Sequence, residues 1–600
     1  MSAPLRPRLP ALGVLLTAAE RALRRFPLVW LSAVVAATAG ILLINSGESE
    51  ERYARVMVAA TLGLPLLFAL AVTAERRFAA QDPRRWAVQG AGIVVLVAIW
   101  WVWPHWPEPV RFARYVQLSA AFHLLAAFLP YAGFNEPNGF WQYNRALFLR
   151  FLVAGIFAAV LYGGLALALG ALDKLFGVDI EGEAYGRLWM MIAFVFTSWF
   201  FLGGIPDDFP GLDARGEVPP VLRIFTQYVL VPIVTIYLVM LTLYLGKVLI
   251  GRQWPSGWIG YLVSSVATVG IFAWLLVWPL EDRPEYRWVR TYTRGFYVAL
   301  LPAIVVLWFA IGKRVAQYGI TEPRYFLIVL SLWLAGIAVY YTLGRSRDIR
   351  VIPATLCVVA LVTAVGPWGA YQFSIGSQRR RLDAMLVRFD LHTATNRAAA
   401  ATRDVPFTDR REISATLRYL VSRHDRRGIA ARFGGSATVE SSDVEQRVRA
   451  IMNSLGVAYV SRYAADESRT TYFLHSEASK APIPISGYQY AIPLDAFRMS
   501  DTLRVDDATA LRYLKPRNVL IVERSGQTVL EIPFVPIIER TVAYRRGHNG
   551  YELPANLMRT EVGKASGPAA LLYLRTLDVT QSDSGWRVTS IGGQLFLRPR

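Results

Sequence analysis

Hydrophobic residues in the first two-thirds of the chain are organised into long, almost uncharged runs. About eleven of these runs are long enough to cross the hydrocarbon core of a bilayer as helices, and none lies beyond residue 374. The expected spans are residues 27–45, 54–74, 87–103, 113–133, 147–170, 187–205, 223–246, 258–280, 294–312, 324–343 and 351–373. The pattern therefore predicts an all-α polytopic transmembrane bundle of about 11 spans, followed by a soluble α+β C-terminal domain.

The last 226 residues change from helical to strand-like periodicity. Apolar residues recur at helical spacing within 377–400 and 409–428, which predicts two helices. From about residue 456, short β-rich runs separated by polar residues predict strands. These runs are residues 457–460, 518–522, 529–536 and 586–597.

These patterns divide the chain into four parts. We expect a basic amphipathic N-terminal segment over 1–26 and the transmembrane helical bundle over 27–374. A helical lead-in of the soluble tail should follow over 375–435, and a soluble β-rich α+β domain over 436–600. Gly434-Gly435-Ser436 is a plausible hinge between the last two parts.

The distribution of charge predicts how the chain crosses the membrane. The net charge is +20, and many arginines stand in short loops between spans, where they orient helices rather than bind nucleic acid. The basic N-terminus and the arginine-rich loop 75–86 should be cytoplasmic, whereas the acidic loops 48–51 and 173–183 should be outside. Eleven crossings then place the C-terminal domain in the periplasm of a bacterial inner-membrane protein, although one miscounted span would reverse its side.

The same composition narrows the chemistry. Cys357 is the single cysteine, which excludes a disulfide framework and cysteine-based zinc sites. Histidines and serines of the tail stand in no nucleophile-elbow context, so we assign no catalytic residue and expect no cofactor. The expected partners are the lipid bilayer and an envelope protein that meets the C-terminal domain, with no nucleic acid.

Three strings of the bundle point to a family. They are Phe140-Trp141-Gln142-Tyr143-Asn144-Arg145, Trp254-Pro255-Ser256-Gly257-Trp258 and Tyr318-Gly319-Ile320-Thr321-Glu322-Pro323-Arg324-Tyr325-Phe326. Together they resemble a bacterial polytopic membrane family catalogued as domain of unknown function four-one-five-three. The resemblance runs from about residue 130 through the last span, and residues 409–414 and 485–488 extend it into the tail. Because that family has no established activity, the resemblance implies membrane placement and no catalytic residue.

The segment 135–145 has an unusual number of amide, carboxylate and aromatic groups for an interhelical loop. Turn formation explains its Glu-Pro and Asn-Gly pairs, and Trp141 and Tyr143 suit a membrane interface. Asn144 and Arg145 are left without such an explanation, so they are candidates for binding a polar ligand or a headgroup.

The string 318–326 mainly indicates the start of a helix. Thr321 can cap the helix, Glu322 complements the positive end of its dipole, and Pro323 suits its first turn. The functional alternative is that Glu322 and Arg324, with Lys313 and Arg314 nearby, form a polar lid over a cavity. We therefore include Glu322 and Arg324 among the candidate ligand-binding residues.

Ionisable residues are almost absent from the spans. His123 is the clearest one at depth, and it is either a candidate functional group or a buried histidine bonded to a backbone carbonyl. Asp207 and Asp208 are adjacent carboxylates after a span, but a hard cation requires more oxygen ligands. We treat them as weak metal candidates in a solvated loop and expect no metal site.

Three function classes remain. The first is an envelope scaffold or sensor with an extracytoplasmic C-terminal domain, and the second is a transporter or channel for an apolar or amphipathic small molecule. The third is a membrane glycosyl transferase that uses a lipid-linked donor, which needs acids near the outer face. Glu48, Glu50 and Glu51 occupy that face, but their loop is too short to hold a catalytic carboxylate rigidly, so an enzyme is disfavoured.

Overall fold

Two compact units make up the chain. The computed structural model describes residues 20–46, 50–106, 108–214, 218–251, 258–344, 348–391, 405–423, 429, 432–433, 443–462, 470–476, 485–494, 502–547, 552–563, 569–582 and 585–598. The first unit comprises residues 1–384 and 419–429, and the second comprises 385–418 and 430–600. Four predicted features lie outside the described residues: most of the amphipathic segment, Glu48, Trp254 to Gly257, and the hinge Gly434 to Ser436.

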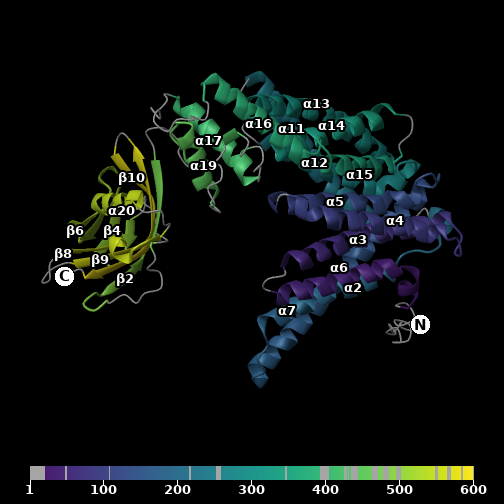
Figure 1. The fold of residues 1–600 in the computed structure, drawn as a ribbon, viewed down its shortest axis with the longest axis horizontal. Coiled ribbons are helices and arrows are strands. Elements are labelled where there is room, and N and C mark those ends of the chain that lie inside the picture. Colours follow the sequence, from purple (N-terminus) through teal and green to yellow (C-terminus); the bar gives the residue numbers. More distant parts are fainter. Residues whose placement is uncertain are drawn as a thin grey trace. The chain divides into compact units, whose positions relative to one another are not determined.

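The first unit is helical. Within the described residues, 10 helices are long and apolar enough to cross a membrane, and they coincide with the first ten predicted spans. The helices that form them are α2 (Pro27–Asn45), α3 (Glu50–Arg77), α4 (Arg84–Val102), α5 (Glu108–Phe128), α6 (Pro137–Phe176), α7 (Gly182–Met190), α8 (Thr197–Leu202), α10 (Pro220–Phe225), α11 (Val231–Gly251), α12 (Trp258–Val277), α13 (Arg287–Tyr318) and α14 (Glu322–Leu343) (Figure 1). The protein is therefore a multi-pass membrane protein, and the lipid bilayer is its environment.

The eleventh apolar run does not form the continuous helix that we expected over 351–373. Helix α15 (Val351–Ala364) has 14 residues, and helix α16 (Ala370–Arg388) begins after a break. Gly366 has a φ of +79°, a conformation that favours glycine, and Pro367 has no backbone N–H to continue the helix. Since 14 residues rise about 21 Å, α15 alone is shorter than the hydrocarbon core of about 30 Å.

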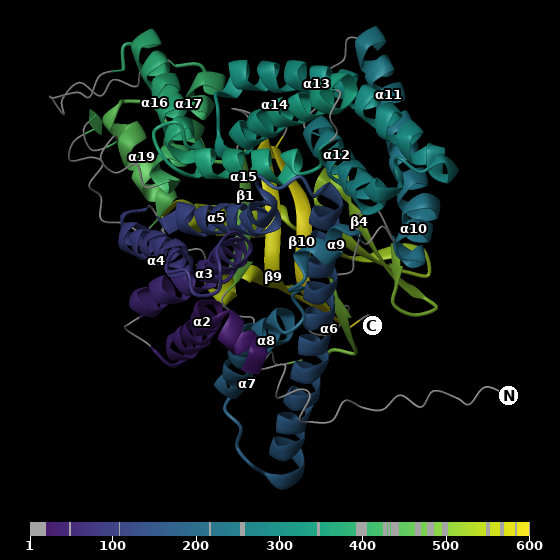
Figure 2. The same ribbon diagram turned by 90° about the vertical axis from the view of Figure 1, so that its right-hand side faces the viewer.

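Helix α15 nevertheless lies along α5 and antiparallel to it (Figures 1 and 2). Three residue pairs mark successive levels along the two segments: Tyr131 with Arg350, Gln117 with Ala360, and Val110 with Tyr371. Residues 110–131 form one of the candidate spans. The stretch 350–371 therefore runs the length of a span. The irregular segment after α15 adds the length that this helix alone does not have.

Small residues let the helices of the bundle approach closely. A Cβ on Gly63 of α3 would overlap the hydroxyl of Ser32 on α2, and that hydroxyl donates to the Ala60 carbonyl at 2.9 Å. A Cβ on Gly270 of α12 would overlap the ring of Phe296 on α13. Such contacts stabilise helix pairs in a bilayer, where apolar surface alone gives little driving force.

The second unit contains two sheets, which share a hydrophobic core with one helix. Its elements are α17 (Phe407–Ser422, shared with the first unit), α19 (Val444–Ser454), β1 (Thr470–Ser476), β2 (Tyr490–Pro493), β3 (Thr502–Arg504), β4 (Thr509–Leu514), β5 (Val519–Arg524), β6 (Gln527–Pro533), α20 (Val535–Gly547), β7 (Glu552–Leu553), β8 (Arg559–Gly563), β9 (Ala569–Ser582) and β10 (Gly585–Arg598). One sheet has the order β2-β10-β9-β1-β7, with β8 also paired to β9, and the other has the order β3-β4-β5-β6. The long strands β9 and β10 lie side by side (Figure 2). The α+β prediction for the tail is confirmed.

Some local predictions for this unit were wrong. Residues 457–460 form no strand, and the run expected over 529–536 divides between β6 and the start of α20. Ser525 and Gly526 form the turn of a hairpin between β5 and β6. Both residues have positive φ, the conformation that matches the twist of the paired strands.

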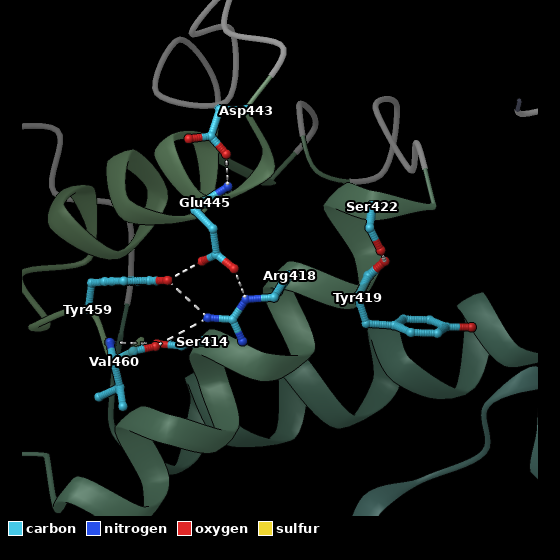
Figure 3. A network of polar contacts seen from close by, with 8 residues as sticks. All are labelled: Ser414, Arg418, Tyr419, Ser422, Asp443, Glu445, Tyr459 and Val460. Carbon is cyan, nitrogen blue, oxygen red and sulfur yellow. Dashed lines mark hydrogen bonds and ion pairs between the residues drawn. The ribbon is translucent and has the colours of Figure 1, made fainter. Parts of the chain in front are cut away.

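A polar network joins α17 to the segment around α19 in the second unit (Figure 3). Arg418 donates to Glu445 at 2.6 Å and to the Tyr459 hydroxyl at 3.0 Å, and Tyr459 also donates to Glu445. Asp443 caps α19 by accepting the Glu445 N–H. These charge-assisted bonds orient the two helices relative to each other. The spacing of apolar residues alone would not fix that orientation.

Candidate functional site

The segment that we took for an interhelical loop is the start of a helix. Pro137 opens α6, and residues 137–145 are its first turns. Trp141 and Tyr143 are buried within the protein and are not exposed at a membrane interface. The Trp141 indole donates to the Leu275 carbonyl at 2.6 Å, and the Tyr143 hydroxyl donates to the Ala126 carbonyl at 3.2 Å.

Arg76 of α3 anchors this helix start. Its guanidinium pairs with Glu136 at 2.6 Å and lies within 5 Å of the ring centroids of Tyr131, Phe134 and Phe209. The Arg76 side chain is 4% exposed, so the ion pair and the surrounding aromatic rings stabilise its charge in place of water. Most of the polar groups of residues 130–140 therefore hold the helix start in place and do not form a ligand site.

Asn144 has a different arrangement. Its Nδ2 donates to the carbonyls of Ala127 (3.1 Å) and Phe140 (2.9 Å). Because carbonyl oxygens only accept, these two bonds fix the orientation of the amide. Among the described residues, no donor reaches Asn144 Oδ1, which remains a free acceptor.

His123 offers a second acceptor by the same reasoning. Its Nδ1 lies 2.7 Å from the Ser119 carbonyl, so Nδ1 carries the proton of the neutral ring. Nε2 then presents a lone pair, and no donor in the described part of the chain reaches it. The carbonyl bond that we considered for His123 is present, but the side chain is exposed rather than buried.

His123 and Asn144 line the same cavity, whose volume is about 410 Å³. Its lining residues are Val29, Leu64, Pro65, Phe68, His123, Ala126, Ala127, Asn144, Leu147, Phe148, Phe151, Ala193, Phe194, Thr197, Ser198, Phe201 and Leu202. Phe148 and Phe151 are 47% and 64% exposed, so the cavity opens on the side of the bundle. It is an apolar cavity with two oriented acceptors, from α5 and α6, and two hydroxyl groups, from α8.

Irregular helices form part of the cavity wall, and we did not foresee them from the sequence. Residues 191–196 form a π-helical turn between α7 and α8, where Thr197 Oγ1 donates to the Ile192 carbonyl at 2.9 Å. Pro65 lies inside α3. A proline inside a span is a visible signal of an irregular helix, whereas nothing in the apolar string around Ala193 indicates a π turn.

The other predicted residues lie elsewhere. Arg145 is half-buried, with its guanidinium 5.6 Å from the Trp141 ring centroid, and it does not line the cavity. Asp208 accepts the N–H of Gly211 at 3.0 Å, and Asp207 is exposed. In the described part of the chain, no three His, Cys, Asp or Glu side chains gather as a metal site would require.

Glu322 and Arg324 have separate partners and do not form one lid. Arg324 donates to the Gly319 carbonyl at 2.8 Å, whereas Glu322 is buried and pairs with Arg423 at 3.1 Å. Burial, and then the Glu322 carboxylate, raise the pKa of the nearby Tyr419 hydroxyl, which keeps it neutral. Thr321 makes no side-chain cap, so that part of the helix-start prediction was wrong.

Comparison with known proteins places the bundle in a family. The family model described as "Domain of unknown function (DUF4153)" matches residues 28–394. The chain belongs to this family. It is also 23% identical over 275 residues to the uncharacterized protein PM1469 of Pasteurella multocida (strain Pm70), a match that covers 45% of this chain and 46% of that protein. The chain thus spans about half the length of this relative. No solved structure matches the chain.

The matched region contains the whole cavity. Every residue that lines it, from Val29 to Leu202, lies within 28–394, as do Glu322 and Arg324. The C-terminal sheets lie outside the match. The cavity is therefore a feature of the family region, whose function is unknown.

Proposed function

We propose that the bundle binds an apolar or amphipathic small molecule that enters from the bilayer, as a transporter or channel for such molecules would. The observation that carries this proposal is the pair of free acceptors, His123 Nε2 and Asn144 Oδ1, in one apolar cavity. An acceptor in an apolar cavity is stabilised by a donor, so the ligand carries a hydroxyl, amine or amide N–H. The volume suits a small molecule or part of one acyl chain and is too small for a whole phospholipid.

A binding experiment tests this proposal. The full-length protein is reconstituted in vesicles, and binding of a fluorescent fatty alcohol is compared with binding of its methyl ether, which has no donor. We expect the alcohol to bind at least about tenfold more tightly, since its single O–H donates one hydrogen bond, to His123 Nε2 or to Asn144 Oδ1, that the ether cannot make.

Four variants locate the binding site. Ala193→Phe fills the cavity and should abolish binding of both probes, whereas His123→Phe and Asn144→Leu each remove one acceptor and should each reduce the preference for the alcohol. His105→Phe is the matched control, because His105 also bonds the carbonyl four residues earlier, at 3.2 Å, but does not line the cavity. Equal binding of alcohol and ether, or an equal loss in the His105 variant, would contradict the proposal.

A second candidate function is an envelope scaffold or sensor, in which the C-terminal unit meets an envelope protein. It is favoured by the separate hydrophobic core of that unit, which both sheets and α20 share. Pull-down of the cross-linked full-length protein from membranes, with and without residues 436–600, tests whether a partner is bound through this part. We also propose the division at 436 for the tail, which limited proteolysis of the full chain near 434–436 would test.

We propose that the protein is an inner-membrane protein with a cytoplasmic N-terminus and a periplasmic C-terminal domain. The antiparallel course of 350–371 along α5 supports an eleventh crossing despite the short α15. Reporters that are active on one side of the membrane, fused after residues 80, 180, 348 and 600, test it. Fusions at 80 and 348 should report the cytoplasm, and those at 180 and 600 the outside; a cytoplasmic signal at 600 would reject the eleventh crossing.

The glycosyl transferase alternative gains no support. Glu50 and Glu51 belong to the first turn of α3, and Glu51 pairs with Arg111 at 3.1 Å. A carboxylate engaged in this way is a structural group at a helix start.

A further inference from the structure

A second cavity, of about 590 Å³, lies at one end of the bundle, and its lining is charged. Three arginines and three carboxylates line it: Arg290, Arg294, Arg350, Glu281, Asp282 and Asp348. None of them lines the apolar cavity described above. What this second cavity binds is therefore a separate question.

The cavity lies at the ends of membrane-spanning helices, where a bilayer has its headgroups. Its walls come from the connections that follow three spans, namely residues 110–131, 259–280 and 322–343, and from the first turns of α13. An even number of crossings separates these connections, so they lie on the same face of the membrane whichever face that is. Trp278 also lines the cavity, as is usual where a protein meets the headgroup region.

Some of the charged groups that line this cavity bond to other parts of the protein. Arg350 binds Asp348 through Nε (2.8 Å) and Nη2 (2.7 Å) and also donates to the Phe134 carbonyl. Glu281 is buried and accepts the Trp274 indole N–H at 3.0 Å. These three groups are structural, because their bonds are already made inside the protein.

An aromatic cluster supports this wall. Trp274, Tyr297 and Tyr341 are fully buried, with ring centroids 4.7 to 5.8 Å apart. The Tyr341 hydroxyl donates to the Asp348 carbonyl at 2.9 Å. The cavity is thus preorganised by packed rings, as a binding site requires.

Arg290 and Arg294 are the charged groups that remain available. They lie one turn apart on α13, and both are exposed. Arg290 pairs with Asp282 at 3.0 Å, but Asp282 is 93% exposed, so this ion pair contributes little. Arg294 pairs with no carboxylate among the described residues.

We propose that Arg290 and Arg294 bind a phosphate group in this cavity, presented either by a lipid headgroup or by a soluble phosphate. Two guanidinium groups one helical turn apart can bind one phosphate through several charge-assisted hydrogen bonds. The phosphate displaces the exposed Asp282 from Arg290. This site goes beyond the proposed binding of an apolar ligand and does not depend on it.

The test uses the full-length protein in phosphate-free detergent and native mass spectrometry. The probes are phosphatidylglycerol, diacylglycerol, glycerol 3-phosphate and inorganic phosphate. We expect a phosphate-bearing probe to bind and diacylglycerol not to bind. Binding of phosphatidylglycerol alone identifies a lipid site, whereas equal binding of glycerol 3-phosphate or inorganic phosphate identifies a soluble source.

The variants R290Q and R294Q should each weaken binding about tenfold, because each removes charge-assisted bonds to the phosphate. R287Q is the matched control, since Arg287 is an exposed arginine at the start of the same helix and does not line the cavity. Size-exclusion profiles of the variants establish that each one is folded. Equal binding of diacylglycerol, an equal loss in R287Q, or no loss in folded R294Q would overturn the proposal.

Discussion

The ion pair between Glu322 and Arg423 should be energetically coupled, and its two ends should differ in cost when removed. The Glu322 side chain is 7% exposed and that of Arg423 is 32% exposed, with 3.1 Å between the charged atoms. Removing Arg423 leaves a nearly buried carboxylate without its cation. Removing Glu322 leaves a guanidinium that water can still reach.

These exposures set the expected magnitudes. Losing one partner of a fully buried pair costs about 3–5 kcal/mol, and an exposed pair is worth about 0–1 kcal/mol. Arg423→Gln should therefore cost about 2–3 kcal/mol, partly offset by the positive end of α14, where Glu322 stands. Glu322→Gln should cost about 1 kcal/mol, and the double variant less than the sum, with a coupling energy of about 1.5 kcal/mol.

Equilibrium unfolding of the detergent-solubilised protein in a denaturing surfactant measures all four members of this cycle. The control cycle uses Arg187 and Glu183, an exposed pair at 2.7 Å on α7, for which we expect at most about 0.5 kcal/mol. If the Glu322–Arg423 coupling is no larger than that of the control, then the ion pair does not stabilise the bundle and our reasoning from burial is refuted.

Three further predictions concern packing and protonation. Gly593 in β10 has a φ of +149°, and an added Cβ would overlap the Tyr573 carbonyl. Gly593→Ala should therefore destabilise the C-terminal sheet by about 2 kcal/mol or more, measured by the loss of strand signal on heating. An unchanged midpoint of that thermal transition would refute this. Gly63→Leu should separate α2 from α3 at Ser32 and lower the unfolding midpoint more than Gly90→Leu, whose Cβ meets open space; equal midpoints would contradict the close approach. Burial raises the pKa of Asp578 above its ordinary 3.8, so its contribution to stability is full at lower pH and is lost as the pH rises through the raised value. Asp578→Asn should therefore gain stability relative to the native chain between pH 3 and 7, and a constant difference across that range would show that the carboxyl is not desolvated.

Much of the candidate site could not be predicted, for identifiable reasons. Asn144 was singled out because turn chemistry did not explain it, but its neighbours Trp141 and Tyr143 were placed at an interface when they are buried. Their partners, the carbonyls of Leu275 and Ala126, belong to other helices, and no local pattern indicates them. The pairing of Glu322 with Arg423 joins residues 101 positions apart and is invisible for the same reason.

The sequence alone determined where the first ten spans lie and that the tail is α+β. Both are local properties, because hydrocarbon requires every backbone group of a span to be satisfied within its own helix, and because short β-rich runs separated by polar residues indicate strands. Only the tertiary structure decided that His123 and Asn144 share a cavity and that the segment around Asn144 is a helix rather than a loop. Those outcomes depend on which helices pack together, and packing is a property of many distant side chains at once.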